Sequence, residues 1–160
     1  MKVYRLVHPR HSPTAFSGEG AFLTGGRWNS PGVRVVYTSS SVALAVLEVL
    51  AYRKARRPLT PRHLYTVRLG EAQVGRLSAP ELPENWQHYP YPDNTHALGD
   101  AWARAGATLA LAVPSVLAPP EANVMLNCAH PDFRGLNIEG PTLFPVNPRL
   151  TPDASGDDDV

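Results

Sequence analysis

Glu48 is the first residue whose type and setting point to chemistry. It is the only ionisable carboxylate in residues 41–52, SVALAVLEVLAY. Because this segment is apolar nearly all round, we expect a helix that is buried on most sides. A buried carboxylate without a partner is strongly destabilising, so Glu48 needs a cation or hydrogen-bond donors. A functional acid, a structural ion pair and a glutamate on a narrow exposed strip remain open alternatives.

Arg27 is the second candidate and lies in the loop TGGRWNSPG, residues 24–32. Paired glycines allow the backbone to approach a ligand closely or to adopt unusual dihedral angles. A guanidinium is a planar fork that binds phosphate with two hydrogen bonds. Trp28 either stacks on a ligand or anchors the loop. The stretch SGEGAFLTGG, residues 17–26, does not match the GxGxxG pattern and precedes a strand, so a Rossmann site is not predicted.

Two hydroxyl groups complete the set of candidate residues. Ser115 follows the apolar segment LALAVP, where Pro114 ends a predicted strand. A hydroxyl there can bind a substrate or cap a turn, and without a GxSxG elbow it is not predicted to be a hydrolase nucleophile. Tyr37 ends the strand that leads to the Glu48 helix. Its ring is expected in the core, and its hydroxyl can face a cleft.

Metal and thiol chemistry are not indicated. The six histidines form no HExxH motif or close ligand pair, and His130 is expected in a turn. No acidic cluster suits Mg²⁺, which disfavours a metal-dependent ribonuclease. The single cysteine, Cys128, cannot form an intrachain disulfide and is expected to be a small buried thiol.

Length and composition indicate one globular domain. The chain has 160 residues, of which 43% are hydrophobic and 18% charged. It contains no run of 18 apolar residues for a membrane helix, and its first residues lack the apolar region of a secretory signal. With one cysteine, the cytoplasm is the expected location.

The charge is unevenly distributed along the chain. All 15 Lys and Arg precede residue 151, whereas four of the 14 acidic residues follow it, which gives net charges of +5 and −4. The modest positive charge of residues 1–150 suits an anionic small molecule or an acidic partner, and is too weak to indicate DNA binding alone. Residues 151–160 are predicted to be a disordered tail.

The strands and helices that must position these residues alternate only partly, which predicts a mixed α+β fold with a central sheet. Two helices are predicted, one from a cap at Ser39–Ser41 to about Arg56 and one over Asp93–Ala105. Residues 8–32 and the proline-rich segments 80–92 and 114–120 are predicted to be loops. Strands are predicted at residues 3–7, 33–38, 64–69, 108–113, 123–127 and 143–146.

Taken together, these segments resemble the RES domain family, toxins of bacterial toxin–antitoxin pairs, over residues 1–150. The family is named for an arginine, a glutamate and a serine, which match Arg27, Glu48 and Ser115. Two positions depart from the family pattern: Tyr52 replaces a frequent histidine, and Asn147 replaces an acid. Supporting segments are VYRL at 3–6, SGEGA at 17–21, VVYTS at 35–39, EANVMLN at 121–127, His130-Pro131 and NPRL at 147–150.

The resemblance implies a fold similar to ADP-ribosyltransferase toxins, with a cleft for NAD. It implies an enzyme that destroys NAD by phosphorolysis or hydrolysis, with inorganic phosphate as one possible co-substrate and no prosthetic group or metal. A protein ADP-ribosyltransferase and a non-enzymatic antitoxin-binding module are the alternatives. The implied partner is an antitoxin with an Xre-like helix-turn-helix domain, which blocks the cleft and alone contacts DNA; a homodimer within the complex is a further possibility.

The resemblance also assigns roles within the NAD site. Arg27 and Arg5 are expected to bind the pyrophosphate, and Glu48 to stabilise an oxocarbenium-like transition state. Tyr37 is expected to stack against the nicotinamide or to form a hydrogen bond with a ribose, and Trp28 is counted among the residues that bind NAD. Ser115 is expected to orient a phosphate or ribose group.

Overall fold

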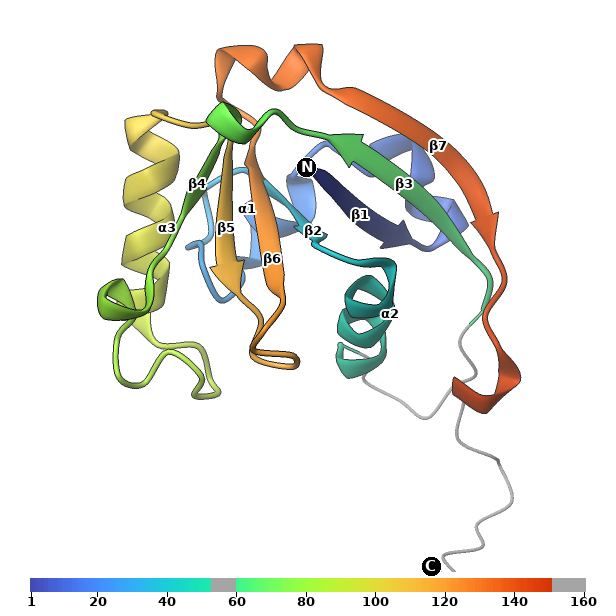
Figure 1. Cartoon of the computed structure of the whole chain (residues 1–160), viewed down its shortest axis with the longest axis horizontal. Helices are drawn as coiled ribbons and strands as arrows, with labels where there is room; N and C mark the ends of the chain where they lie inside the picture. Colours follow the sequence, from blue (N-terminus) through green and yellow to red (C-terminus); the bar gives the residue numbers. More distant parts are fainter. Residues whose placement is uncertain (53–59, 151–160) are drawn as a thin grey trace, which may run out of the picture.

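The computed structural model of the chain describes residues 1–52 and 60–150. A seven-stranded sheet in the order β4-β5-β6-β2-β1-β3-β7 forms its centre (Figure 1). Neighbouring strands are antiparallel except for the parallel pair β4 and β5. The sheet and its flanking helices confirm the predicted α+β class. The strands are β1 (Lys2–Val7), β2 (Val35–Ser39), β3 (Arg62–Arg68), β4 (Val74–Arg76), β5 (Ala110–Pro114), β6 (Ala122–Asn127) and β7 (Asn137–Phe144).

Three α-helices accompany the sheet: α1 (Glu19–Thr24), α2 (Val42–Ala51) and α3 (Asp93–Ala105). Helix α3 lies beside β4 and β5, and α2 lies beside β2 and β1 (Figure 1). None of the helices in the described part of the chain has the length and apolarity to span a membrane. Short 3₁₀ helices are η1 (Pro9–Thr14), η2 (Glu71–Gln73), η3 (Ala79–Glu81), η4 (Pro131–Gly135) and η5 (Pro148–Leu150).

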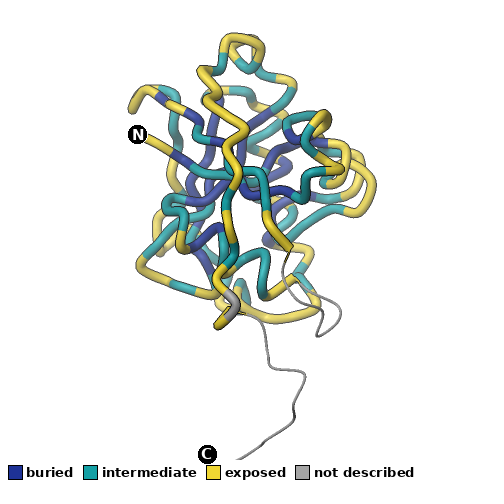
Figure 2. Tube along the Cα trace, turned by 90° about the vertical axis from the view of Figure 1, so that its right-hand side faces the viewer, coloured by how far each residue is buried: buried dark blue, intermediate teal, exposed yellow. Residues whose placement is uncertain are grey.

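The hydrophobic core lies on both faces of the sheet. Alternation along β6 sends Val124 to one face and Met125 to the other, and both side chains are fully buried. Figure 2 shows the buried residues gathered in the interior of the molecule and the exposed residues around them. Burying a side chain of this size stabilises the fold by roughly 1.5–3 kcal/mol.

The sheet consists of two parts that meet at a single residue pair. Strands β1 and β2 pair only at Tyr4 and Ser39, whereas β1 pairs with β3 along its whole length. Beyond that pair, the Arg5 side chain donates hydrogen bonds to the carbonyls of Tyr37 (2.6 Å) and Ala15 (2.7 Å). Arg5 thus binds a backbone acceptor of β2 at the point where the two strands separate.

Helix α2 begins as the sequence predicts. Ser41 is its N-cap, and the Ser41 hydroxyl accepts a hydrogen bond from the amide of Leu44 (3.0 Å). The described helix ends at Ala51. The predicted end near Arg56 and the predicted tail 151–160 both lie outside the described residues.

Helix α3 has the predicted bounds and ends at Gly106 with a φ of +59°. Its inner face packs directly against the loop that carries Arg27. A Cβ built on Gly99 would lie 1.7 Å from the carbonyl oxygen of Trp28. On the next residue, Asp100, a carboxylate oxygen accepts a hydrogen bond from the amide of Ser30 (3.0 Å).

Three elements differ from the sequence prediction. Helix α1 lies within the predicted loop 8–32, because Gly18 and Gly25 at its ends give the segment a loop-like composition. Strand β4 was not predicted, since its three residues are held by parallel pairing with β5. Strand β7 precedes and only overlaps the predicted strand 143–146; it is exposed along nearly its whole length and therefore lacks a hydrophobic alternation.

The contact between α3 and the Arg27 loop gives a stability prediction. We expect Gly99→Ala to destabilise the protein by about 2 kcal/mol or more, because the new methyl group collides with backbone. The control is Gly20→Ala in α1, whose Cβ would meet no atom within 4 Å and which should stabilise by about 0.5 kcal/mol. Urea unfolding measures both, and equal stability of the two variants would contradict the packing described.

Candidate active site

The Glu48 carboxylate is held by two hydrogen bonds to one of its oxygens. It is half-buried on α2, and its Oε1 accepts from Asn123 Nδ2 (2.5 Å) and from the Ser115 hydroxyl (3.3 Å). Within residues 1–52 and 60–150, no hydrogen bond reaches Oε2. The carboxylate is therefore fixed by neutral donors on one side and has acceptor capacity left on the other.

Ser115 lies in the loop between β5 and β6 and is fully buried. Its hydroxyl accepts hydrogen bonds from the amides of Leu117 (3.1 Å) and Ala118 (3.2 Å) and donates to Glu48. The expected role of Ser115 in orienting a phosphate or ribose stays a prediction, since the side chain is covered in this structure. Ser115 acts here on Glu48 and on the turn.

The same loop also holds the start of α2. The Glu121 carboxylate accepts hydrogen bonds from the hydroxyls of Ser40 (3.3 Å) and of the N-cap Ser41. The Ser115 amide donates to the carbonyl of Glu121 across the loop (3.0 Å). The loop therefore fixes α2 at both its first turn and Glu48, which sets the position of the carboxylate.

Arg27 lies on the same side of the molecule as Glu48. Its Nη1 donates to the carbonyls of Trp86 (2.6 Å) and His88 (2.8 Å), and its guanidinium lies over the Tyr91 ring, 4.8 Å from the centroid. Burial lowers the pKa of Arg27, while electrostatic interactions with Tyr91 and Glu48 oppose that shift. Arg27 and Glu48 are thus close enough to interact electrostatically.

The loop that carries Arg27 is held by a buried asparagine. The Asn29 side chain is fully buried, and its Nδ2 donates to the carbonyls of Ala21, Ser30 and Val33 at 3.0–3.1 Å. A single β-bridge joins Asn29 to Gly26 within the loop. These bonds make the loop a rigid support for the arginine beside it.

Tyr37 and Trp28 fix the same loop from the sheet side. The Tyr37 hydroxyl donates to Asn29 Oδ1 (2.8 Å) and accepts from the Trp28 amide (3.1 Å), and burial raises its pKa. Trp28 is only 2% exposed and packs near Trp86, with 6.1 Å between ring centroids. This packing fits the anchoring alternative for Trp28, and its expected contact with a ligand stays a prediction.

Arg5 lies behind the sheet, apart from Arg27 and Glu48. Paired residues share a face of a sheet, so Tyr4, Ser39 and Asn123 lie on the Glu48 face. Arg5 follows Tyr4 along β1 and points to the opposite face, where burial lowers its pKa to about 10. The structure places the Arg5 guanidinium on backbone carbonyls behind the sheet, so it does not bring Arg5 together with Arg27 and Glu48, and the expected binding of the pyrophosphate by Arg5 stays a prediction.

Two residues of the site were not predicted from the sequence. Asn123 was included in a predicted strand and in a family segment but not among the site residues, although a polar side chain at the start of an apolar strand was a usable signal. Tyr91 lies in the proline-rich segment before α3, which carried no such signal. Burial raises the pKa of Tyr91, and the neighbouring Tyr52 and Glu48 add to this effect.

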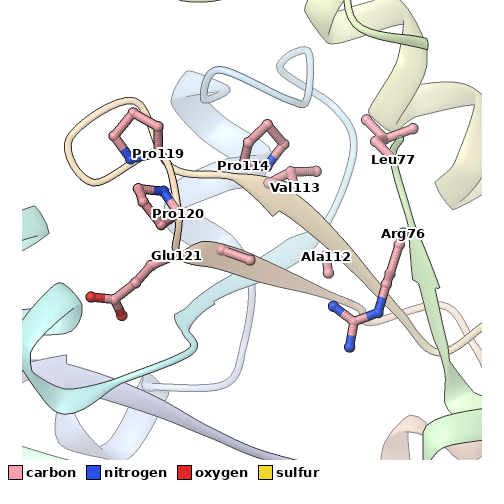
Figure 3. A pocket seen from close by; sticks show the side chains of 9 residues that line it. Arg76, Leu77, Ala112, Val113, Pro114, Pro119, Pro120 and Glu121 are labelled. Atoms are coloured by element: carbon pink, nitrogen blue, oxygen red, sulfur yellow. The ribbon is translucent and has the colours of Figure 1, made fainter. Parts of the chain in front are cut away.

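A shallow hollow elsewhere on the molecule is not the candidate active site. It lies between the end of β4 and the loop after β5 (Figure 3). Its lining is mostly apolar, and the carboxylate of Glu121 at its rim is bound to Ser40 and Ser41.

In the described ranges, no group of three or more His, Cys, Asp or Glu is placed to hold a metal ion.

Comparison with known proteins identifies the family. A family model described as RES domain matches residues 2–146. The chain belongs to the RES domain family. It is 35% identical over 151 residues to "Toxin Res" of Yersinia enterocolitica, covering 94% of this chain and 99% of that protein. It is 39% identical over 152 residues to "Toxin Res" of Photorhabdus laumondii, covering 94% of this chain and 97% of that protein.

Two further relatives extend this comparison. The chain is 35% identical to the "Prs ADP-ribosylating toxin" of a Sphingobium species, covering 84% of this chain and 85% of that protein. The structure resembles a chain in the crystal structure of the M. tuberculosis MbcT-MbcA toxin-antitoxin complex, with a TM-score of 0.70 at 19% identity over 93% and 85% of the two chains. That last likeness establishes a shared fold.

The two tyrosines of the site should respond differently to loss of their hydroxyls. Tyr37→Phe leaves the Trp28 amide and Asn29 Oδ1 without their partner, so we expect a loss of about 1–3 kcal/mol in the free energy of unfolding. Tyr91→Phe keeps the ring over Arg27 and should change the free energy of unfolding by less than about 0.5 kcal/mol. Chemical denaturation compares them, and an equally small effect of Tyr37→Phe would contradict its role in holding the loop.

Proposed function

We propose that this RES protein is the toxin of a toxin–antitoxin pair and that it consumes NAD. The observation that carries the proposal is the half-buried Glu48 carboxylate, bound by Asn123 and Ser115 through Oε1 only and accompanied by the Arg27 guanidinium. Membership of a family with relatives named toxins supports the biological role.

The reaction we propose is cleavage of the bond between nicotinamide and ribose. Nicotinamide leaves with the bonding electron pair as a neutral base, so the leaving group needs no general acid. Positive charge develops on the ribosyl carbon, as in glycoside cleavage. Glu48, accepting hydroxyl protons of this ribose at Oε2, would stabilise that charge in the transition state. An oxygen of water or of inorganic phosphate then supplies the electron pair for the new bond, and water releases its proton to solvent.

Arg27 would bind the pyrophosphate of NAD. Its Nη1 is used by the carbonyls of Trp86 and His88, while Nε and Nη2 make no hydrogen bond within the described residues. An arginine held on one edge and stacked on Tyr91 is pre-oriented for an anion on its other edge. The positive charge of Arg27 would attract the dinucleotide, and the rigid loop would position the bound dinucleotide relative to the Glu48 carboxylate.

Transfer of ADP-ribose to a protein is the second candidate. The observation that favours it is the 35% identity to the Prs ADP-ribosylating toxin, over 84% of this chain. The bond that breaks in NAD is the same in both reactions, so the same residues would serve, and only the acceptor differs.

Incubation of the purified protein with NAD, with and without inorganic phosphate, tests both candidates. We expect free nicotinamide and ADP-ribose, or its phosphorylated form when phosphate is the acceptor, to appear on chromatography. Biotin-labelled NAD added to a cell extract would label a protein if transfer is the activity. An NAD pool that stays intact in every arm would contradict the proposed function.

Glu48→Gln is the variant that tests the role of the carboxylate. The amide oxygen can still accept from Asn123, so folding should be retained, whereas the lost charge should lower the rate of NAD loss by at least about 100-fold. Growth of cells expressing this variant should recover. The matched control is Glu71→Gln, an exposed residue of η2, which should remain toxic. A stably expressed Glu48→Gln protein with full toxicity would refute the assignment.

We further propose that an antitoxin of the Xre-like type controls the site in trans. An arginine prepared for a phosphate accepts a carboxylate equally well, so the inhibitory segment should present an acidic side chain or its own C-terminus near Arg27. The product of the neighbouring open reading frame should co-purify with this protein and suppress NAD loss. A stable complex that consumes NAD as fast as the free protein would exclude occlusion of the site.

A further inference from the structure

We propose that Asn123 is a positioning residue, which fixes the orientation of the Glu48 carboxylate for catalysis. The proposal rests on the proposed function for its kinetic consequences, while its structural part concerns only these two side chains. Their contact, Asn123 Nδ2 to Glu48 Oε1 at 2.5 Å, is the shorter of the two hydrogen bonds to the carboxylate.

The strand pairing determines which way the Asn123 amide faces. Asn123 on β6 pairs with Ser39 on β2, and the Ser39 hydroxyl donates to Asn123 Oδ1 (3.0 Å). With Oδ1 used as an acceptor, the amide nitrogen is directed at Glu48. Because an amide nitrogen can only donate, it requires an acceptor oxygen on the glutamate.

The second partner of Oε1 imposes the same requirement. Two backbone amides, those of Leu117 and Ala118, donate to the Ser115 hydroxyl oxygen, so its hydrogen remains for Glu48. Both partners of Oε1 are therefore donors, and neither can accept a proton from a carboxylic acid. Asn123 and Ser115 together hold the glutamate with Oε1 as acceptor and leave Oε2 for the substrate.

Two titratable groups outside α2 interact electrostatically with Glu48 in the described ranges. Arg27 approaches from the loop after α1, and Tyr91 from the segment before α3. Glu121 lies on the β5–β6 loop and is bound to Ser40 and Ser41 at the start of α2. Unlike these three side chains, Asn123 contributes a neutral hydrogen-bond donor. Replacing it with an aspartate would therefore put a repelling carboxylate in place of a donor that binds Glu48.

Two variants separate positioning from a general loss of structure. We expect Asn123→Ala to lower kcat for NAD loss by about 10- to 100-fold, with KM changed by less than about threefold, because the bond acts on Glu48 and not on bound substrate. N123D keeps the shape of the side chain. At acidic pH its protonated carboxyl can still donate to Glu48, so activity should be retained there.

The pH profile of N123D then gives the decisive readout. As the pH rises, the shared proton is lost and two carboxylates face each other, so the activity of N123D should fall where that of the wild type does not. If Asn123 served only to stabilise the fold, the activity of N123D would not decline with rising pH in this way. An N123D profile parallel to the wild type, or an Asn123→Ala variant with unchanged kcat, would overturn the proposal.

A measurement without NAD separates this proposal from the proposed function. Carbon-13 NMR of the side-chain carboxyls in N123D should show Glu48 and the introduced carboxyl titrating as a coupled pair. Independent titration of the two groups would overturn the positioning role even if the wild type consumes NAD. Coupled titration in a protein that leaves NAD intact would instead uphold the contact and refute the proposed function alone.

Discussion

Holding one carboxylate on an apolar helix is the constraint on which the rest of the site depends. Glu48 has no salt bridge within the described residues; neutral donors from Asn123 and Ser115 bind it instead. Neutral donors stabilise the charge without a counter-ion that would occupy the second oxygen. The electrostatic partner, Arg27, acts from a separate loop and remains available to an anion.

Much of the architecture serves to keep these two groups in place. The β5–β6 loop binds α2 through Glu121 as well as through Ser115, so the helix cannot turn without breaking both contacts. The Arg27 loop is fixed between the sheet and α3, where Gly99 allows the backbones to meet. Preorganisation of this kind lets a site stabilise developing charge without reorganising during the reaction.

The sequence singled out the two charged candidates of the site through local features, whereas it did not predict the contacts that hold them. Glu48 stood out because a carboxylate is costly in an apolar helix, and Arg27 because glycines flank it; both follow from local physical rules. The bounds of α3 were predictable since proline precedes it and glycine ends it. In each of these cases the determining interactions lie within a few residues.

Where the structure departs from the prediction or adds to it, the determining contact is distant in the sequence. Arg5 was assigned to the pyrophosphate because of its charge, but the pairing of Tyr4 with Ser39 directs it to the opposite face. Asn123 reaches Glu48 across 75 residues of sequence. Strand β7 follows from its register with β3 and not from its own exposed residues. Such tertiary constraints leave little trace in local composition.

The position of the substrate relative to Glu48 and Arg27 is the central claim of this account. A crystal structure of the Glu48→Gln variant soaked with NAD measures it directly, because the slowed variant should retain intact dinucleotide. We predict a ribose hydroxyl within hydrogen-bond distance of the side chain at position 48, on the side away from Asn123, and the pyrophosphate at Arg27. NAD bound elsewhere, or bound with its nicotinamide ribose remote from position 48, would contradict the account.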